Sequence, residues 1–326
     1  MGSYGGHVLP GSFFIFFGIW YVIGYSWSYF TSRSKKDYNY YGTFYCCGKL
    51  PCSMLVVEGC LKIFFTSVGT LVELFYPGAP MGALHNSDGD FTHPMNWQHA
   101  TMYFFFGLSG LADIISYTAK NVVPKGLDRI MGGLALFVEG YLFFFHLHGR
   151  SMIDTRCHVL LVIAVWPCAL FALLEAFLIN NRAVLHLLEM FHSILLIFQG
   201  VWFWMVAYIL YPPSGERWDP CFTEAKMDAH QLAELKEHQH NSSGEEKTCN
   251  EGKVHLNVMF ITMFWSWALA FVSIGVGIIY FLVYKWLKMR RQLDRSFCIS
   301  EERTALKMES RHKGLLDGED EDEEAF

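Results

Sequence analysis

Apolar residues in this chain form seven continuous runs, each long enough to cross a membrane as a helix. The runs lie at roughly 7–30, 55–76, 97–118, 127–148, 155–178, 184–210 and 254–287. A membrane core needs about 20 apolar residues of helix. The runs do not alternate with polar residues as barrel strands would, and lipid admits only helices or closed barrels. The pattern therefore predicts an all-α membrane protein, a bundle of seven transmembrane helices.

Composition supports a membrane protein, and its change along the chain separates a transmembrane domain from a polar tail. Of its 326 residues, 52% are hydrophobic and only 17% charged, whereas a soluble domain carries about 25% charged residues. A soluble protein with unusually apolar helices is therefore a poor alternative. We expect a transmembrane domain at 1–290, which includes a polar loop at 212–253. An acidic cytoplasmic tail at 291–326 should be disordered. Basic stretches are short, so nucleic acid is not an expected partner.

The distribution of Lys and Arg predicts the orientation of the bundle. These residues gather at 31–54, at 119–126 with Arg129 just beyond, at Arg182, and from Lys285 onward. The N-terminus and the 77–96 loop contain neither residue. Positive connections stay in the cytoplasm, so the N-terminus is expected outside and the C-terminus in the cytoplasm. Arg150 and Arg156 disagree with this assignment.

Two features of the 212–253 loop fit an outward position. Asn241 begins an Asn-Ser-Ser glycosylation sequence. Cys221 and Cys249 are candidates for a disulfide in an oxidising compartment. On the predicted cytoplasmic side, Cys46, Cys47 and Cys52 lie beside basic residues. Such cysteines suit S-palmitoylation, with plain reduced thiols as the alternative.

Ionisable residues inside membrane helices are costly and tend to face the bundle interior. The outward ends of the runs carry one layer: His99, His146, His148, Asp154, His158 and His255. Asp154 and His158 are spaced i,i+4 and share a helix face. If the histidines converge, they suit a metal, a haem or proton transfer. The alternative is scattered interface residues. His146 and His148 point to nearly opposite faces unless the helix breaks near Gly149.

A second layer lies deeper or toward the predicted cytoplasmic side. It contains Glu58, Lys62, Asp113, Glu139, Glu175, His186, Glu189 and His192. Glu58 and Lys62 have the i,i+4 spacing of a neutralising pair, and His186 and Glu189 are placed to pair across one turn. A polar track joining the two layers would indicate ion or proton movement. Trp202 and Trp204, toward the outward end of the sixth run, are expected in an interfacial aromatic belt.

Several segments resemble the transmembrane protein 45 family, including its transmembrane epididymal protein branch. They are GHVLPGSFF at the start, HATMYFFFGLSGLADI, FVEGYLFFFHLHGRSMID, LLIFQGVWFWMVAYILYPPSG and HLNVMF. The resemblance implies a seven-helix protein of secretory-pathway membranes (Golgi or related vesicles) or the plasma membrane, with no established activity. It implies a shared set of polar positions: Glu139, His146, His148, Gly149, Arg150, Asp154, His158, Gln199, His255 and Asn257.

The chain also departs from that pattern. Gln98, Leu256 and Ala268 stand where relatives have further polar residues, which puts a metal or haem site in doubt for this member. Soluble-enzyme motifs such as GxSxG, HExxH and CxxC are absent from the sequence. Three functions remain: a membrane protein that acts through partners or trafficking, a membrane enzyme or redox protein with an outward His/Asp site, and an ion or proton pathway. The lipid bilayer is the one partner that the sequence predicts. Catalytic residues, cofactors and protein partners are unknown.

Overall fold

The structure, a computed structural model, describes residues 4–32, 54–76, 81–119, 121–145, 147, 150–215, 218–219, 251–290 and 308. Within these ranges the chain forms seven helices and a single isolated bridge between His85 and Phe91. The helices are α1 (Tyr4–Ser32), α2 (Met54–Phe75), α3 (Pro94–Thr118), α4 (Leu127–Phe145), α5 (Met152–Phe177), α6 (Arg182–Leu210) and α9 (Glu251–Met289). Every predicted run overlaps one of them.

Three helix boundaries differ from the hydrophobic runs, and local polar groups set two of them. The α5 helix begins at Met152, before its apolar run, because the Ser151 hydroxyl caps the amide of Asp154 at 3.3 Å. The α4 helix ends at Phe145, earlier than expected. The α6 helix begins after Asn181, whose side chain accepts a hydrogen bond from the Val184 amide at 3.4 Å.

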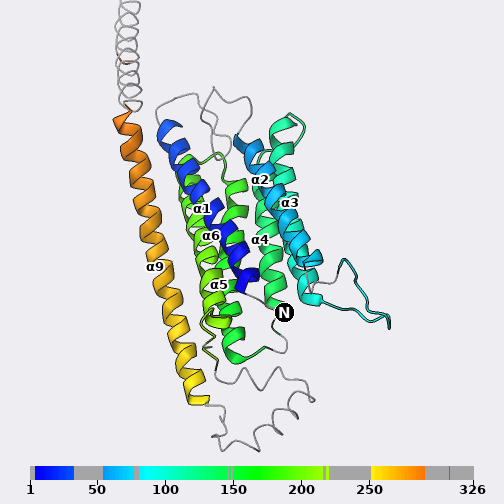
Figure 1. Ribbon diagram of the computed structural model, residues 1–326. Helices are drawn as coiled ribbons and strands as arrows, with labels where there is room; N and C mark the ends of the chain where they lie inside the picture. Colours follow the sequence, from blue (N-terminus) through cyan, green and yellow to red (C-terminus); the bar gives the residue numbers. More distant parts are fainter. Residues whose placement is uncertain are drawn as a thin grey trace, which may run out of the picture.

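Successive helices run in opposite directions, so the bundle has two distinct ends (Figure 1). We name the end at which α1, α3, α5 and α9 begin the His158 end. The end at which α2, α4 and α6 begin is the Arg129 end. The described residues of the predicted outward layer lie toward the first, and most of those in the inner layer lie toward the second.

Two helix pairs pack with their backbones close together. A methyl group built on Gly11 of α1 would lie 2.8 Å from the carbonyl oxygen of Gly200 in α6. One built on Gly59 of α2 would lie 2.5 Å from that of Gly110 in α3. Small residues permit such close helix crossings in membranes. The α1–α6 pair and the α2–α3 pair are therefore locked by glycine contacts, while α1 and α2 make few direct contacts with each other.

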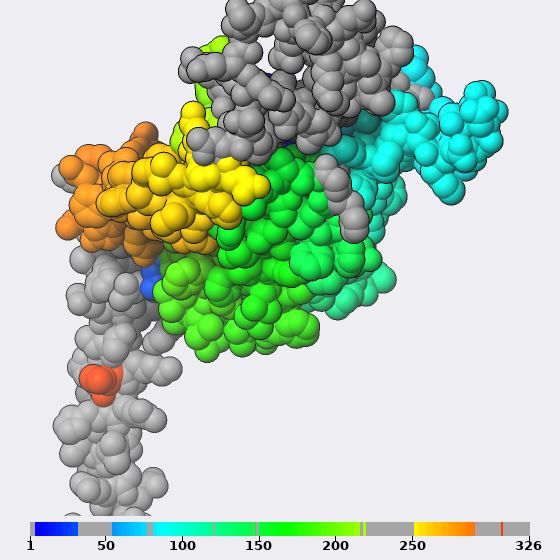
Figure 2. Space-filling model, turned by 90° about the horizontal axis from the view of Figure 1, so that it is seen from below, coloured from blue at the N-terminus to red at the C-terminus, as the bar shows by residue number. Residues whose placement is uncertain are grey.

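The α9 helix lies along one side of this bundle. It contacts α1, α5 and α6, and Trp265 donates a hydrogen bond to the Leu160 carbonyl of α5 at 3.0 Å. Viewed from the His158 end, α9 lies at one side of the bundle, and the loop that precedes α3 extends on the opposite side (Figure 2). The polar interior of the bundle is therefore built by the other six helices.

The distribution of side chains is that of a multi-pass membrane protein. Phe64, Phe104, Phe271 and Phe281 are 59–63% exposed, whereas Glu58, Asp113, Glu139, Glu175 and Glu189 are at most 2% exposed. A soluble protein shows the reverse. Five helices, α1, α2, α5, α6 and α9, are long and apolar enough to cross a membrane by length and composition.

One sequence expectation is wrong. Trp202 does not belong to an interfacial belt, because its side chain is fully buried and its indole donates to the Cys157 carbonyl at 3.0 Å. Trp204 is also tied to a neighbouring helix, since its indole donates to the Ser12 hydroxyl of α1 at 3.2 Å. Both residues join helices within the bundle, and a sequence run that is apolar on every side does not reveal which face is buried.

Candidate functional site

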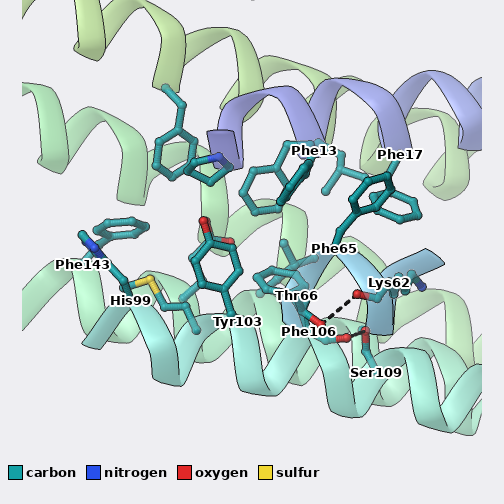
Figure 3. Close-up of a pocket in the computed structure, with 18 of the residues that line it drawn as sticks. Phe13, Phe17, Lys62, Phe65, Thr66, His99, Tyr103, Phe106, Ser109 and Phe143 are labelled. Atoms are coloured by element: carbon teal, nitrogen blue, oxygen red, sulfur yellow. Dashed lines mark hydrogen bonds between the residues drawn. The ribbon is translucent and has the colours of Figure 1, made fainter. Parts of the chain in front are cut away.

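A cavity of about 120 Å³ lies in the seam between the two glycine-locked pairs. We refer to it as the chamber. Side chains from α1, α2, α3, α4 and α6 line it, and most of them are apolar. Figure 3 shows His99 and Phe143 at one end, Tyr103 in the middle, and Lys62 and Ser109 toward the other end. The chamber therefore runs along α3, from the His158 end toward the Arg129 end.

Aromatic rings form the walls where the backbones of α1 and α2 stand apart. Phe65 of α2 lies against Phe13 of α1, with ring centroids 4.8 Å apart. Phe14 of α1 contacts Phe106 of α3 at 5.4 Å and stacks on Phe203 of α6 at 5.7 Å. These rings fill the seam from several helices and leave the chamber between them.

Glu139 of α4 is the unusual polar residue in the wall. It is 2% exposed, and its Oε2 atom has no hydrogen-bond partner. Among the described residues that line the chamber, it alone has a buried side-chain polar atom of this kind. The Tyr103 ring lies close enough to interact with it electrostatically. Leaving such an atom unsatisfied costs about 1–3 kcal/mol. A ligand in the chamber that donates a hydrogen bond to this oxygen would remove that cost.

Two hydroxyl groups in the wall already donate to their own helices. Thr66 donates to the Lys62 carbonyl and Ser109 to the Phe106 carbonyl, each at 2.8 Å (dashed lines in Figure 3). Their protons are therefore not available to a ligand, while each hydroxyl oxygen can still accept a hydrogen bond.

The Lys62 ammonium closes the Arg129 end of the chamber. It lies 2.9 Å from Glu58 and 2.7 Å from Asp113. The sequence spacing predicted the Glu58 pair, and the structure adds Asp113 from α3. Glu58 also accepts hydrogen bonds from Tyr21 at 2.7 Å and Trp20 at 3.2 Å. This cluster ties α1, α2 and α3 together.

Arg129 organises a second buried cluster. Its guanidinium pairs with Glu175 of α5 and, at 2.9 Å, with Glu189 of α6. His192 approaches the other Glu175 oxygen at 2.9 Å. Arg129 is therefore a structural charge inside the bundle, and it no longer counts among the loop charges that predicted the orientation. The rule that intramembrane charges pair would have found it.

The predicted pair of His186 and Glu189 is looser than its spacing suggests. The His186 Nδ1 atom lies 3.7 Å from Glu189, and neither ring nitrogen has a hydrogen-bond partner. The His186 ring instead stacks on Tyr29 of α1, with centroids 3.9 Å apart. Arg129 holds Glu189 from across the bundle, so the local pair is not the dominant contact.

A smaller cavity of about 40 Å³ lies between the Lys62 and Arg129 clusters. Four residues line both this cavity and the chamber: Tyr21, Lys62, Gly132 and His192. A Cβ built on Gly132 meets no atom within 4 Å. The absence of a side chain at Gly132 therefore leaves space where the two cavities adjoin.

At the His158 end, Asp154 and His158 pair as their spacing predicts. Asp154 Oδ1 lies 2.8 Å from His158 Nδ1 and accepts from Arg150 at 2.7 Å. The ring of His7, which lines the chamber, packs edge-on against His158 with centroids 5.9 Å apart. The chamber thus reaches the neighbourhood of this polar group.

His99 belongs to a different group of residues. Its Nδ1 atom lies 3.2 Å from Glu73 of α2, and Asn96 donates to the same carboxyl group at 3.1 Å. His99 and Glu73 both line the chamber. His255 does not join either group, because it is exposed on α9, while Asn257 donates to the Trp218 carbonyl at 2.6 Å.

Several predicted residues lie outside the described part of the chain. They are His146, His148, Cys46, Cys47, Cys52, Cys221, Asn241 and Cys249. Among the described residues, no three His, Cys, Asp or Glu side chains gather as a metal site would require. Gln199 is fully buried on α6, and its amide atoms have no hydrogen-bond partner.

Sequence reasoning missed the chamber and the residues that shape it, above all Phe65, Tyr103 and Gly132. No sequence signal marks them, because each lies in an apolar run and gains its role from helices far away in the chain. The residues of the wall that did carry a signal were the ionisable ones, among them Glu139, Lys62, His99 and His192.

Similarity to known proteins covers the same helices. Residues 125–281 match the family described as "Family of unknown function (DUF716)". Transmembrane epididymal protein 1A of Mus musculus is 27% identical over 240 residues, 67% of this chain and 71% of that protein. Transmembrane epididymal protein 1 of Homo sapiens is 32% identical over 167 residues, 49% of this chain and 58% of that protein. The Rattus norvegicus protein of that name is 25% identical over 226 residues, 67% and 71% of the two chains.

These matches confirm the resemblance seen in the sequence. Residues 125–281, which include α4, α5, α6 and most of α9, are similar to the DUF716 family, which is the transmembrane protein 45 family.

Proposed function

We propose that this multi-pass membrane protein binds a small, largely apolar molecule in the chamber. The observation that carries the proposal is one cavity with aromatic walls and a buried, unpartnered carboxyl oxygen. Small-molecule sites have this character, because apolar walls supply affinity and a few polar groups fix orientation. Sites of this kind lie between the helices of bundles.

The dimensions of the chamber limit the ligand. His99 and Ser109 are ten residues apart on α3, which corresponds to about 15 Å of helix. The cavity is close in size to an engineered apolar cavity of about 150 Å³ that admits benzene. A single slim chain or one small ring therefore fits, and a two-chain phospholipid does not.

Filling the chamber tests the proposal. Gly132→Leu places a side chain where a Cβ meets nothing, so it occupies the cavity without a backbone clash. Gly277→Leu is the matched control, because Gly277 also has open space around it but lies on α9, outside the chamber. A ten-carbon alcohol with a photoactivatable diazirine is added to protein in nanodiscs, and cross-linked peptides are mapped by mass spectrometry.

We expect the wild type and Gly277→Leu to cross-link within the chamber, and Gly132→Leu to lose at least nine-tenths of that signal. Cross-links confined to lipid-facing positions, or equal chamber labelling in all three proteins, would contradict the proposal.

An ion or proton pathway is the second candidate. The observation in its favour is that the chamber and the smaller cavity share Lys62 and His192, and the chamber also reaches His7 and His99. Groups of both predicted polar layers thus line adjoining spaces. Purified protein in liposomes should then dissipate a proton or cation gradient, and flux no greater than in empty liposomes argues against it.

The outward histidines keep a third proposal open, a metal or haem site. Asp154 beside His158 supports it, because a carboxylate commonly orients a ligating imidazole. An absorption spectrum and elemental analysis of purified protein test it, with His158→Ala as the variant expected to lose the bound group. Equal metal or haem content in the two proteins would count against the site.

The topology proposed from the sequence has all seven helices crossing the membrane, with the N-terminus outside. Their alternating directions support it, as does the pairing of charges from α3 and α4 inside the bundle. Asn241→Gln should remove a glycan mobility shift, and a wild-type band unchanged by glycosidase would leave the outward loop unsupported. Location in secretory-pathway or plasma membranes, and action through partners or trafficking, stay predictions.

A further inference from the structure

We infer that the chamber selects an amphipathic amine: a small apolar body that carries a basic nitrogen. This inference rests on the proposed function, since it names the class of molecule that the chamber binds. Three observations lead to it: the charges that line the cavity, the unpartnered oxygen of Glu139, and the aromatic walls.

Three of the four basic side chains in the wall already face carboxyl groups, and the fourth, His7, packs against the rings of His158, Phe203 and Tyr211. Lys62 contacts Glu58 and Asp113, His99 contacts Glu73, and His192 contacts Glu175. A ligand carboxylate or phosphate would meet no uncompensated cation, and it would bring a further negative charge close to these groups. The Lys62 cluster contains two carboxyl groups and one ammonium, so its balance favours a cation.

Glu139 supplies the anchor for such a cation. Its side chain is 2% exposed, it lines the chamber, and its Oε2 atom has no partner. An isolated buried carboxylate is costly, so this carboxyl group holds a proton when the chamber contains no cation. An amine that enters uncharged accepts this proton, and the complex then holds an ammonium–carboxylate pair with no net change in protons.

The aromatic wall suits the rest of the ligand. The rings of Phe65, Phe106 and Tyr103 border the cavity along its length (Figure 3). Aromatic faces attract a desolvated ammonium, and they pack equally well against an alkyl chain or ring. The Tyr103 hydroxyl is a second acceptor near Glu139. The same wall offers a carboxylate no comparable attraction.

The test compares three ligands that differ only in the polar group: decylamine, decan-1-ol and decanoate. Binding to full-length protein in phosphatidylcholine nanodiscs is measured by titration calorimetry, with empty nanodiscs subtracted. Glu139→Gln preserves the shape of the side chain but removes its acidic proton. Glu251→Gln makes the same change at an exposed position on α9, outside the chamber.

We expect decylamine to bind wild type and Glu251→Gln at least tenfold more tightly than decan-1-ol does, with no detectable decanoate binding. Glu139→Gln should lower decylamine affinity at least tenfold and leave decan-1-ol unchanged. Equal affinity for amine and alcohol, or an equal loss of both in Glu139→Gln, overturns the amine assignment but leaves chamber binding intact. Binding of none of the three ligands, together with absent chamber cross-links, overturns the proposed function itself.

Discussion

Two sets of buried carboxyl groups lie within the same helix bundle and differ in what surrounds them. Glu175 and Glu189 share the Arg129 guanidinium, and His192 approaches Glu175 as well. Glu139 is equally buried, yet one of its oxygens faces the chamber wall without a partner. The first set joins α4, α5 and α6. The second joins no helices, which is why we assign structural roles to the Arg129 cluster and a binding role to Glu139.

The two sets of carboxyl groups should also differ in how substitutions change the free energy of unfolding. Removing one partner of a buried ion pair typically costs 3–5 kcal/mol, because the other charge stays buried without compensation. Replacing an unsatisfied buried polar group by an apolar one instead removes a penalty of about 1–3 kcal/mol. Substitutions in the two sets should therefore change stability with opposite signs.

The largest effect is expected from Arg129→Met. The variant leaves Glu175 and Glu189 buried without their guanidinium, and we expect a loss of about 3–5 kcal/mol in the free energy of unfolding. The melting temperature in nanodiscs, followed by tryptophan fluorescence, measures it. The triple variant Arg129→Met/Glu175→Gln/Glu189→Gln removes the stranded charges and should recover most of the loss. An unchanged melting temperature in Arg129→Met would remove the structural role assigned to this cluster.

A somewhat smaller loss, about 3 kcal/mol, is expected for Lys62→Met. Its two carboxyl partners are as buried as those of Arg129, but the lysine side chain itself is 13% exposed. Access to water therefore relieves part of the penalty. Lys288→Met, at an exposed position near the end of α9, is the control and should melt like the wild type. Equal melting temperatures for both variants would show that Lys62 does not hold α2 and α3 together.

The opposite sign is expected for Glu139→Leu, which should stabilise the protein by about 1 kcal/mol. The gain arises because an unpartnered oxygen is replaced by apolar atoms against an apolar wall. Chemical denaturation in mixed micelles measures the change, while binding of the amine probe should be lost. A destabilisation comparable to that of Arg129→Met would mean that Glu139 is a structural residue like Glu175.

The smallest effect concerns the two kinds of glycine in the bundle. Gly132→Ala should stabilise α4 by about 0.5–1 kcal/mol, because alanine favours helix and its methyl group enters open space. Gly59→Ala should destabilise, since its methyl group would lie 2.5 Å from the Gly110 carbonyl oxygen. Melting temperatures that shift in the same direction for both variants would contradict the assignment of one glycine to a cavity and the other to a helix contact.

The sequence predicts contacts within a helix better than contacts between helices. The i,i+4 spacing anticipated both the Glu58–Lys62 and the Asp154–His158 pairs, because helix geometry alone places such residues on one face. The same rule gave too much weight to His186 and Glu189, where Arg129 from another helix takes the carboxyl group. Hydrophobic runs located the seven helices of the described ranges, since lipid exposure demands continuous apolar segments.

The chamber was beyond such reasoning for a physical reason. Its walls come from five helices, and its existence depends on how far apart α1 and α2 stand, which the Gly11–Gly200 and Gly59–Gly110 contacts determine jointly. Glu139 was identified as an intramembrane carboxyl group, but its lack of a partner is a property of the assembled bundle. The order of residues along the chain reveals neither the separation of α1 and α2 nor the missing hydrogen-bond partner of Glu139.

The contact between Gly11 and Gly200 has a consequence for synthesis of the protein. The α1 helix leaves the ribosome before α6, with which it makes this close contact, and roughly 150 residues separate the two helices. At about 5–20 residues per second, α1 waits roughly 7 to 30 s before α6 begins to emerge. During that interval its glycine face can contact only lipid, the insertion machinery or the helices already made. The α1 helix thus reaches this neighbour late, and a chain that stops before α6 exposes that face permanently.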